Sequence, residues 1–320
     1  MKKFSDLAVL VTGGTGSFGR KFVEKVLHGD KPRKLIVFSR DELKQHEMRS
    51  GGLDADCMRY FIGDVRDRER LHRAMKDVDV VIHAAALKHV PACEYNPIEA
   101  IQTNIIGAQN VINAAIDMGV GNALALSTDK AVNPANLYGA SKLCAEKLFV
   151  QSNAYSGGKT VFSCVRYGNV VGSRGSVIPL FLEQRKTGTI TITDERMTRF
   201  WLTLDQGVDF VLRSLELMRG GEIFVPKIPS ASLADLAEAM APGCKKVITG
   251  IRPGEKLHEC LLSEDEARHT VELHDMFVIE PEDESWGFRR WKGSKPKEHW
   301  QYSSDTNTQR LTVEQLRALV

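Results

Sequence analysis

The chain has 320 residues, 42% of them hydrophobic and 26% charged, which is typical of a globular protein with one large domain and room for a smaller one. Its formal net charge is +2 and its basic residues are scattered, so the composition disfavours nucleic-acid binding. No apolar run approaches the ~18 residues of a membrane span.

The six cysteines are widely spaced and form no Cys-x-x-Cys pair. This favours free thiols in a reducing compartment over disulfides or a metal site. The apolar run near the N-terminus is too short for a signal peptide and ends in a glycine turn. We therefore expect a cytoplasmic protein with no metal, membrane or nucleic-acid partner.

The first predicted strand, residues 7–11, leads into a glycine-rich turn and then a helical pattern. The glycines are Gly13, Gly16 and Gly19, with two residues between successive members. Strand, glycine turn and helix in this order are the context of a dinucleotide fingerprint, because glycine lets the backbone approach a pyrophosphate at the positive helix end.

The second predicted strand, residues 35–38, ends where such a fold tests the adenosine ribose. An acidic residue at this point would bind the free 2'-hydroxyl of NAD. The chain instead has Ser39 and Arg40, with Lys44 a turn later, and a guanidinium can bind a 2'-phosphate. These residues favour NADP. In the alternative interpretation, Ser39 to Glu42 is a capping box, and Arg40 and Lys44 are merely solvated.

Two further strands are predicted at residues 58–62 and 78–83. Asp64, after the first of them, can accept a hydrogen bond from adenine or can cap the helix predicted over 67–75. The second is followed by Ala84 to Ala86, whose small side chains let a flat ring pass. A single long helix is predicted over 97–118.

The next predicted strand, residues 123–126, is followed by Thr128, Asp129 and Lys130. Asp129 and Lys130 are a possible acid and a possible base at the sheet edge where open α/β folds bind ligands. Tyr138 and Lys142 lie four positions apart in a helical pattern and therefore share one face. Because a free phenol has a pKa of ~10, the charge of Lys142 should favour the phenolate of Tyr138.

Five strand-helix units and a sixth strand at 161–165 predict a doubly wound, parallel α/β sheet of the Rossmann type. From about residue 172 short helices and strands replace the regular alternation. We therefore expect a cofactor domain over 1–171 and a smaller mixed α/β substrate domain over 172–320, with residues 204–220 returning to the first domain. Arg199 and Arg252 are candidates for anionic groups of a substrate.

These motifs resemble the extended short-chain dehydrogenase/reductase superfamily. The segments Ser39–Glu42, 85–91, 127–134 and 138–142 are more narrowly similar to the configuration-inverting UDP-N-acetylglucosamine 4,6-dehydratases. Those enzymes begin pseudaminic acid biosynthesis for flagellin glycosylation. The resemblance implies a homo-oligomer that binds NADP and UDP-N-acetylglucosamine.

The resemblance also implies catalytic roles. Tyr138, next to Lys142, would take the proton of the sugar 4-hydroxyl, held by Thr128, while hydride passes to NADP. Lys130 would then remove the proton on carbon 5, and Asp129 would protonate the departing 6-hydroxyl. A free Lys has a pKa of ~10.4, so this role requires a lowered pKa, for which Lys142 and Lys88 are the candidate causes.

The binding residues implied by the resemblance fall into two groups. The cofactor group comprises Gly13, Thr15, Gly16, Ser17, Phe18, Gly19, Ser39, Arg40, Asp41, Lys44, Asp64, Val65, Ala84, Ala86, Lys88, Ser127, Tyr138, Lys142 and Val170. The substrate group comprises Lys88, Asn169, Gly175, Ser176, Val177, Ile178, Ile192, Arg199, Arg252 and Glu255.

Two other functions are open to the sequence. A UDP-N-acetylhexosamine 4-epimerase needs the cofactor and Tyr138 but no acid/base pair for removing water, so Asp129 and Lys130 discriminate against it. A non-catalytic NADP-binding sensor or scaffold is the alternative of another class, because this fold hosts such roles. The intact set of Tyr138, Lys142, Asp129 and Lys130 argues against it.

Overall fold

The structure is a computed structural model that describes residues 3–173, 176–283 and 285–319. A nine-stranded sheet forms its centre, in the order β14-β15-β10-β6-β5-β4-β1-β2-β3. These strands are β1 (Ala8–Thr12), β2 (Lys34–Ser39), β3 (Met58–Ile62), β4 (Val80–His83), β5 (Asn122–Thr128), β6 (Val161–Tyr167), β10 (Ile223–Pro226), β14 (Thr270–Glu272) and β15 (Met276–Ile279).

The strands from β3 to β10 pair in parallel, and β15 and β14 extend the sheet antiparallel beyond β10. Strands β1, β2, β4, β5, β6 and β10 are buried on both faces, as their near-continuous apolar runs require, whereas the edge strand β3 is partly exposed. The Rossmann-type α/β fold is therefore confirmed. The two antiparallel strands were not predicted.

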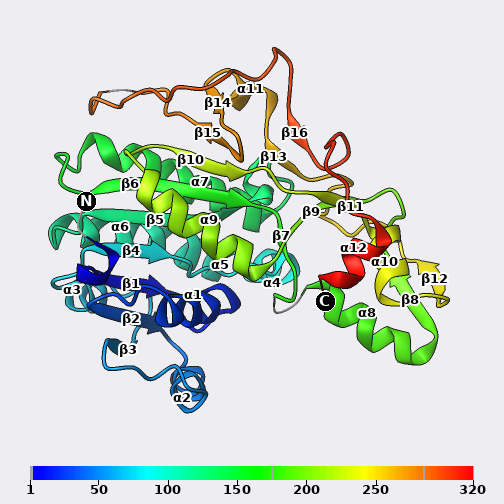
Figure 1. The fold of residues 1–320 in the computed structure, drawn as a ribbon, viewed down its shortest axis with the longest axis horizontal. Coiled ribbons are helices and arrows are strands. Elements are labelled where there is room, and N and C mark those ends of the chain that lie inside the picture. The colour runs from blue at the N-terminus through cyan, green and yellow to red at the C-terminus, as the bar shows by residue number, and fades with distance from the viewer. Residues whose placement is uncertain (1–2, 174–175, 284, 320) are drawn as a thin grey trace.

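Helices cover both faces of the sheet. Helices α1 (Ser17–His28) and α9 (Leu204–Leu217) pack together on one face, which is the front face in Figure 1. On the opposite face lie α3 (Arg68–Ala74), α6 (Gly107–Asp117) and α7 (Leu137–Gln151). The remaining helices of this body are α2 (Glu42–Ser50), α4 (Val90–Tyr95), α5 (Pro97–Ile101) and α11 (Glu264–Ala267), with short helical turns at Phe4–Asp6, Asp129–Ala131 (η3) and Ser152–Ala154.

The helix predicted over 97–118 is present, and it contains a π-helical turn, Gln102–Ile106, between α5 and α6. Two alternatives that the sequence left open are excluded. Helix α2 is capped by Asp41, which accepts from the Lys44 amide, so no capping box starts at Ser39. Helix α3 is capped by Asp67 and not by Asp64.

A small lobe, defined by α8, β8, β12, α10 and α12, lies to the right of the sheet in Figure 1. Its elements are α8 (Val177–Gln184), a turn at Arg185–Thr187, β8 (Thr189–Ile192), α10 (Leu233–Met240), β12 (Lys245–Ile248) and α12 (Val313–Ala318). Helix α12 begins with a capping box formed by Thr312 and Gln315. The lobe has an apolar core of its own, separate from the core around the sheet.

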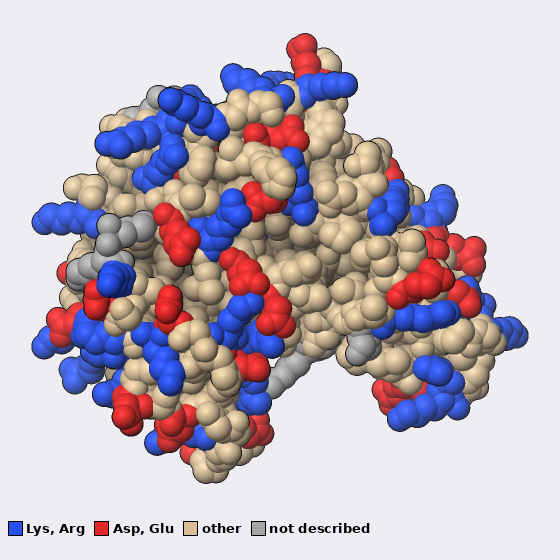
Figure 2. All heavy atoms as spheres, viewed as in Figure 1, with Lys and Arg blue, Asp and Glu red and all other residues tan. Residues whose placement is uncertain are grey.

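Short strands connect the sheet and the small lobe. They are β7 (Asn169–Val170), β9 (Thr198–Leu202), β11 (Ser230–Ser232), β13 (Cys260–Leu262) and β16 (Tyr302–Ser303). Figure 2 shows a hollow between the large body and the lobe, with acidic and basic side chains interspersed over this face. No helix in the described ranges combines the length and the apolar character needed to cross a membrane.

Candidate active site

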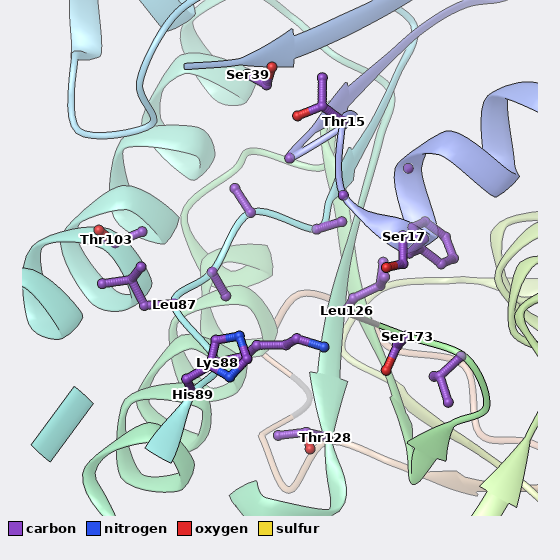
Figure 3. Close-up of a pocket in the computed structure, with 18 of the residues that line it drawn as sticks. Thr15, Ser17, Ser39, Leu87, Lys88, His89, Thr103, Leu126, Thr128 and Ser173 are labelled. Atoms are coloured by element: carbon purple, nitrogen blue, oxygen red, sulfur yellow. The ribbon is translucent and has the colours of Figure 1, made fainter. Parts of the chain in front are cut away.

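A cavity of about 680 Å³ opens at the carboxyl ends of the parallel strands. Its walls come from the turn after β1, the end of β2, the loops after β3 and β4, the end of β5, the start of α7 and the β7 segment. In Figure 3, Thr15 and Ser39 lie at one end of this cavity and Thr128 at the other. The pocket is therefore elongated and runs along the edge where parallel α/β sheets bind ligands.

The glycine turn after β1 forms one wall of the pocket. At two of its positions only glycine fits. Gly13 has a φ of +65°, and a Cβ on it would lie 2.8 Å from the Cα of Ala85. A Cβ on Gly19 would lie 2.4 Å from the Cα of Gly14. Helix α1 starts at Ser17 without a side-chain cap, so its positive end faces the pocket and suits a diphosphate.

Predicted adenosine-binding residues gather at the far end of the pocket, where Ser39, Arg40, Asp41, Lys44, Asp64 and Val65 all line the wall. Arg40 is about half exposed, and its Nη1 lies 3.4 Å from Oδ2 of Asp64. Lys44 pairs with Asp41. Arg40 and Lys44 thus each pair with a carboxylate, and both remain partly exposed at this end of the pocket.

The acid/base pair sits where β5 ends in the turn η3. The Thr128 hydroxyl donates to Oδ1 of Asp129 at 2.8 Å, and Nζ of Lys130 donates to the same oxygen at 3.0 Å. A third group, not foreseen from the sequence, completes the cluster: Oε1 of Glu259 lies 3.3 Å from the Lys130 amine. Asp129 and Glu259 are both buried.

These contacts set the charge of Lys130. Burial favours the neutral amine, but the carboxylates of Asp129 and Glu259 outweigh burial and raise the pKa of Lys130 above its ordinary value. The expectation that neighbouring lysines lower the pKa of Lys130 is therefore wrong for the protein without bound ligands. Lys88, in contrast, has a lowered pKa, because of burial and the charge of Lys130.

Tyr138 lies in the first turn of α7, which is capped by the side chain of Asn136. Burial raises the pKa of Tyr138 to about 12, although the Lys130 charge and a hydrogen bond with Thr128 oppose the shift. The cation that most favours the Tyr138 phenolate is thus Lys130. The helical spacing had predicted Lys142 for this role. Lys142 is itself buried, which lowers its pKa.

The loop after β4 is held in place from the π-helical turn. The Asn104 amide donates to the Leu87 carbonyl at 2.9 Å and to the Ser141 hydroxyl at 2.9 Å, and its oxygen accepts from the Leu87 amide at 2.8 Å. These bonds fix Lys88, whose amine extends across the pocket in Figure 3. Ala84 and Ala86 line the same wall.

The predicted substrate residues divide into two sets. Asn169, Val170 and Ser176 line the pocket next to Thr128 and Ser127. Val177, Ile178 and Ile192 belong to α8 and β8 of the small lobe, where Ile178 and Ile192 are buried in the core. Gly175 lies outside the described residues.

The two predicted arginines are placed very differently. The guanidinium of Arg199 is buried and donates to the carbonyls of Thr198, Lys256 and Leu257, so in this structure it is not available to hold a diphosphate. Arg252 is exposed and lies 3.8 Å from Glu255. The turn that contains Arg252 and Glu255 lies beside the start of α7, where the Asn136 amide donates to the Gly254 carbonyl at 2.8 Å.

Several buried polar atoms at this site have no hydrogen-bond partner among the described residues. They are Oγ of Ser127, Oδ2 of Asp129, Oδ1 of Asn169, Oγ of Ser176 and Oε2 of Glu259. Ser127, Asn169 and Ser176 line the pocket, whereas Asp129 and Glu259 contact Lys130. Buried polar groups are normally paired, so the unpaired atoms on the pocket wall indicate that a polar ligand completes them. The glycine cradle and these atoms fit a dinucleotide and a polar substrate.

Comparison with known proteins agrees with this geometry. The family model described as polysaccharide biosynthesis protein matches residues 9–281. The chain is similar to the inverting UDP-N-acetylglucosamine 4,6-dehydratase of Campylobacter jejuni, with 53% identity over 99% of this chain and 98% of the relative. It is also similar to a UDP-glucose 4-epimerase of Rickettsia akari, with 42% identity over 99% and 96%.

The fold is similar to a crystal structure of dTDP-glucose 4,6-dehydratase from Streptomyces venezuelae with NAD bound. The TM-score is 0.72 and the identity 25%, covering 78% of this chain and 87% of that one.

Proposed function

Because the chain belongs to the polysaccharide biosynthesis protein family of extended short-chain dehydrogenases/reductases, we propose that it removes water from UDP-N-acetylglucosamine, with inversion at carbon 5. The single observation that supports this best is the hydrogen-bonded pair of Asp129 and Lys130, at the same end of the pocket as Tyr138. An acid and a base beside the tyrosine that deprotonates the 4-hydroxyl are what elimination adds to epimerisation.

A nicotinamide dinucleotide held along the glycine turn and the end of β2 would supply a hydride acceptor for carbon 4 of the sugar and, once reduced, a hydride donor for carbon 6. Tyr138 takes the proton of the 4-hydroxyl while Thr128 holds that oxygen. The ketone that results acidifies the proton on carbon 5. Lys130 removes this proton, and Asp129 protonates the 6-hydroxyl, which departs as water as the bond between carbons 5 and 6 becomes double.

The raised pKa of Lys130 is compatible with this role because of its bond to Asp129. Transfer of one proton along the 3.0 Å hydrogen bond from Lys130 to Asp129 gives a neutral amine and a protonated carboxyl group. These are the base and the acid that elimination requires, and no proton is exchanged with solvent. A substrate that displaces water from the pocket favours this neutral form, because burial penalises separated charges.

A 4,6-dehydratase and a 4-epimerase can be distinguished by the mass of the product. Incubating the holoprotein with UDP-N-acetylglucosamine should give a product that has lost one water molecule, as detected by mass spectrometry. UDP-glucose, the substrate named for the epimerase relative, serves as the competing substrate. Recovery of isomers of unchanged mass from both sugars would reject dehydration in favour of 4-epimerisation.

We also propose NADP as the cofactor. Replacing Arg40 by Asp should reverse the preference between NADP and NAD by about 100-fold, because an arginine-phosphate pair is lost and a carboxylate is gained beside the ribose. Dissociation constants for both dinucleotides measure this change, with Arg33→Asp as the matched control at an exposed site outside the pocket. An unchanged preference would assign the 2'-phosphate to other residues.

The product fits the first step of pseudaminic acid biosynthesis for flagellin glycosylation, which we propose as the pathway. We further propose the cytoplasm as the compartment, since the six cysteines are free and the cofactor is a cellular dinucleotide, and a homo-oligomer as the assembly.

A further inference from the structure

Glu259 is a buried carboxylate that contacts Lys130 of the acid/base pair. It lies directly before strand β13. Its amide donates to the Ser304 hydroxyl at 3.0 Å, and its carbonyl accepts from the Ser304 amide at 2.8 Å. Strand β13, which follows it directly, lies against η3. The backbone thus fixes Glu259 on both sides, and its side chain reaches across to Lys130.

The segment is also anchored to the catalytic helix. The Arg166 guanidinium, fully buried on β6, bonds Oε2 of Glu146 on α7 at 2.6 Å and Oε1 of Glu266 at 2.9 Å. It also donates to the Leu261 carbonyl at 3.1 Å. Glu259 therefore keeps its place relative to α7, the helix that presents Tyr138.

The charges around Lys130 come from four segments. Asp129 lies on η3 itself, Glu259 on the segment before β13, and Lys88 on the loop after β4, where the Lys130 charge lowers the pKa of Lys88. Arg199 on β9 approaches Glu259, with Nε 3.8 Å from Oε1. The Tyr138 phenol completes the surroundings.

We propose that Glu259 is a positioning residue of the elimination step, which holds the Lys130 amine in line with the sugar and stabilises the ammonium group formed there. The inference rests on the proposed function. A lysine with one acceptor can turn about its flexible stem, whereas acceptors on two sides, Asp129 and Glu259, fix its direction. The other oxygen of this carboxylate, Oε2, is buried and has no hydrogen-bond partner among the described residues, so no second donor competes with Lys130 for it.

The charge balance explains why a second carboxylate helps. Once Lys130 has given its proton to Asp129, the negative charge of Glu259 remains beside the neutral amine. The bond between carbon 5 and its proton then breaks, the proton goes to the Lys130 nitrogen, and the proton of Asp129 leaves with the 6-hydroxyl. Positive charge thus develops 3.3 Å from a fixed anion, which stabilises the transition state.

The test is Glu259→Gln, which keeps the shape and removes the charge. Oxidation at carbon 4, read as the absorbance of reduced cofactor in a single turnover, should stay within about twofold, because it does not use Lys130 as base. Exchange of the carbon 5 proton with deuterium oxide should fall by about 10- to 100-fold. The pH at which exchange becomes maximal should also move down by about one unit, since an anion that favours the ammonium form is gone.

Two further variants complete the design. Glu264→Gln is the matched control, because Glu264 lies five residues along the same segment, is half exposed and pairs with His299. It should change neither step. Glu259→Asp restores the charge and should recover the pH profile of the wild type, with exchange still reduced by the shorter reach.

The outcomes distinguish a failure of the positioning role from a failure of the proposed function. An equal loss of oxidation and exchange, or an unchanged pH profile in Glu259→Gln, would overturn the positioning role. If that variant does not fold, Glu259→Asp decides, because a positioning role requires exchange to fall more than oxidation. Absence of both water loss and exchange in the wild type would instead reject the proposed function itself.

Discussion

Replacing Lys130 by alanine should leave cofactor binding intact and slow exchange at carbon 5 by about 1,000-fold. Oxidation at carbon 4 should slow far less, because it loses only the help that the Lys130 charge gives to the Tyr138 phenolate. The reason is that the Lys130 amine is the basic nitrogen held against Asp129 and Glu259. Single-turnover absorbance of the reduced cofactor and magnetic resonance of the sugar in deuterium oxide measure the two steps separately.

The variant Lys130→Arg separates the loss of the base from the loss of the positive charge. Arginine keeps the positive charge between the two carboxylates but does not lose its proton in proteins. It should therefore restore the fold and the charge balance but not the exchange. Lys186→Ala, at an exposed position of the small lobe, is the matched control. Exchange at the wild-type rate in either Lys130 variant would remove Lys130 from the mechanism.

Replacing Tyr138 by phenylalanine should slow oxidation at carbon 4 by about 1,000-fold and abolish every later step. The ring packs against Cys93 and Ala100 and is retained, so folding should be preserved. Because burial raises the pKa of Tyr138 to about 12, the phenolate fraction rises with pH over the neutral range. Oxidation by the wild type should therefore accelerate as the pH increases, and the phenylalanine variant should lose this dependence.

Tyr155→Phe is the matched control for this change. Its hydroxyl pairs with Ser152 at 2.6 Å, away from the pocket, and the side chain is exposed. It should leave both steps unchanged. Reduced cofactor appearing at the wild-type rate in Tyr138→Phe would show that another group accepts the 4-hydroxyl proton.

The parts of the site that the sequence could predict are those fixed by local geometry. The glycine turn follows from spacing, because only glycine tolerates the close approach at Gly13 and Gly19. Tyr138 and Lys142 share a helix face, and Asp129 and Lys130 follow a buried strand, so their placement follows from periodicity alone. The parallel sheet follows from the repeated alternation of strands and helices.

The rest depends on contacts between residues far apart in the chain. Glu259 meets Lys130 only after the C-terminal segment folds back onto η3, and this contact reverses the expected direction of the Lys130 pKa shift. Arg199 is likewise drawn to carbonyls of residues 256 and 257 and not to the pocket. A Glu directly before the apolar run of β13 was the one sequence signal for a buried carboxylate there.

The boundary predicted between a cofactor domain and a substrate domain stays a prediction. Strand β10 and the antiparallel strands β15 and β14 all lie in the central sheet although they follow residue 172. Helix α9, in the region expected to return to the first domain, packs on α1. The places of β10, β15 and β14 in the sheet are set by strand pairing, which hydrophobic patterning does not reveal.

The most direct test of the acid/base account is incubation of the wild-type holoprotein with UDP-N-acetylglucosamine in deuterium oxide, with the position of deuterium in the product read by magnetic resonance. A proton removed from carbon 5 by an amine and replaced from the other face must leave deuterium there. The account predicts a 4-keto-6-deoxy sugar that has lost water and carries deuterium at carbon 5 with inverted configuration. A product that retains the original hydrogen at carbon 5 would contradict it.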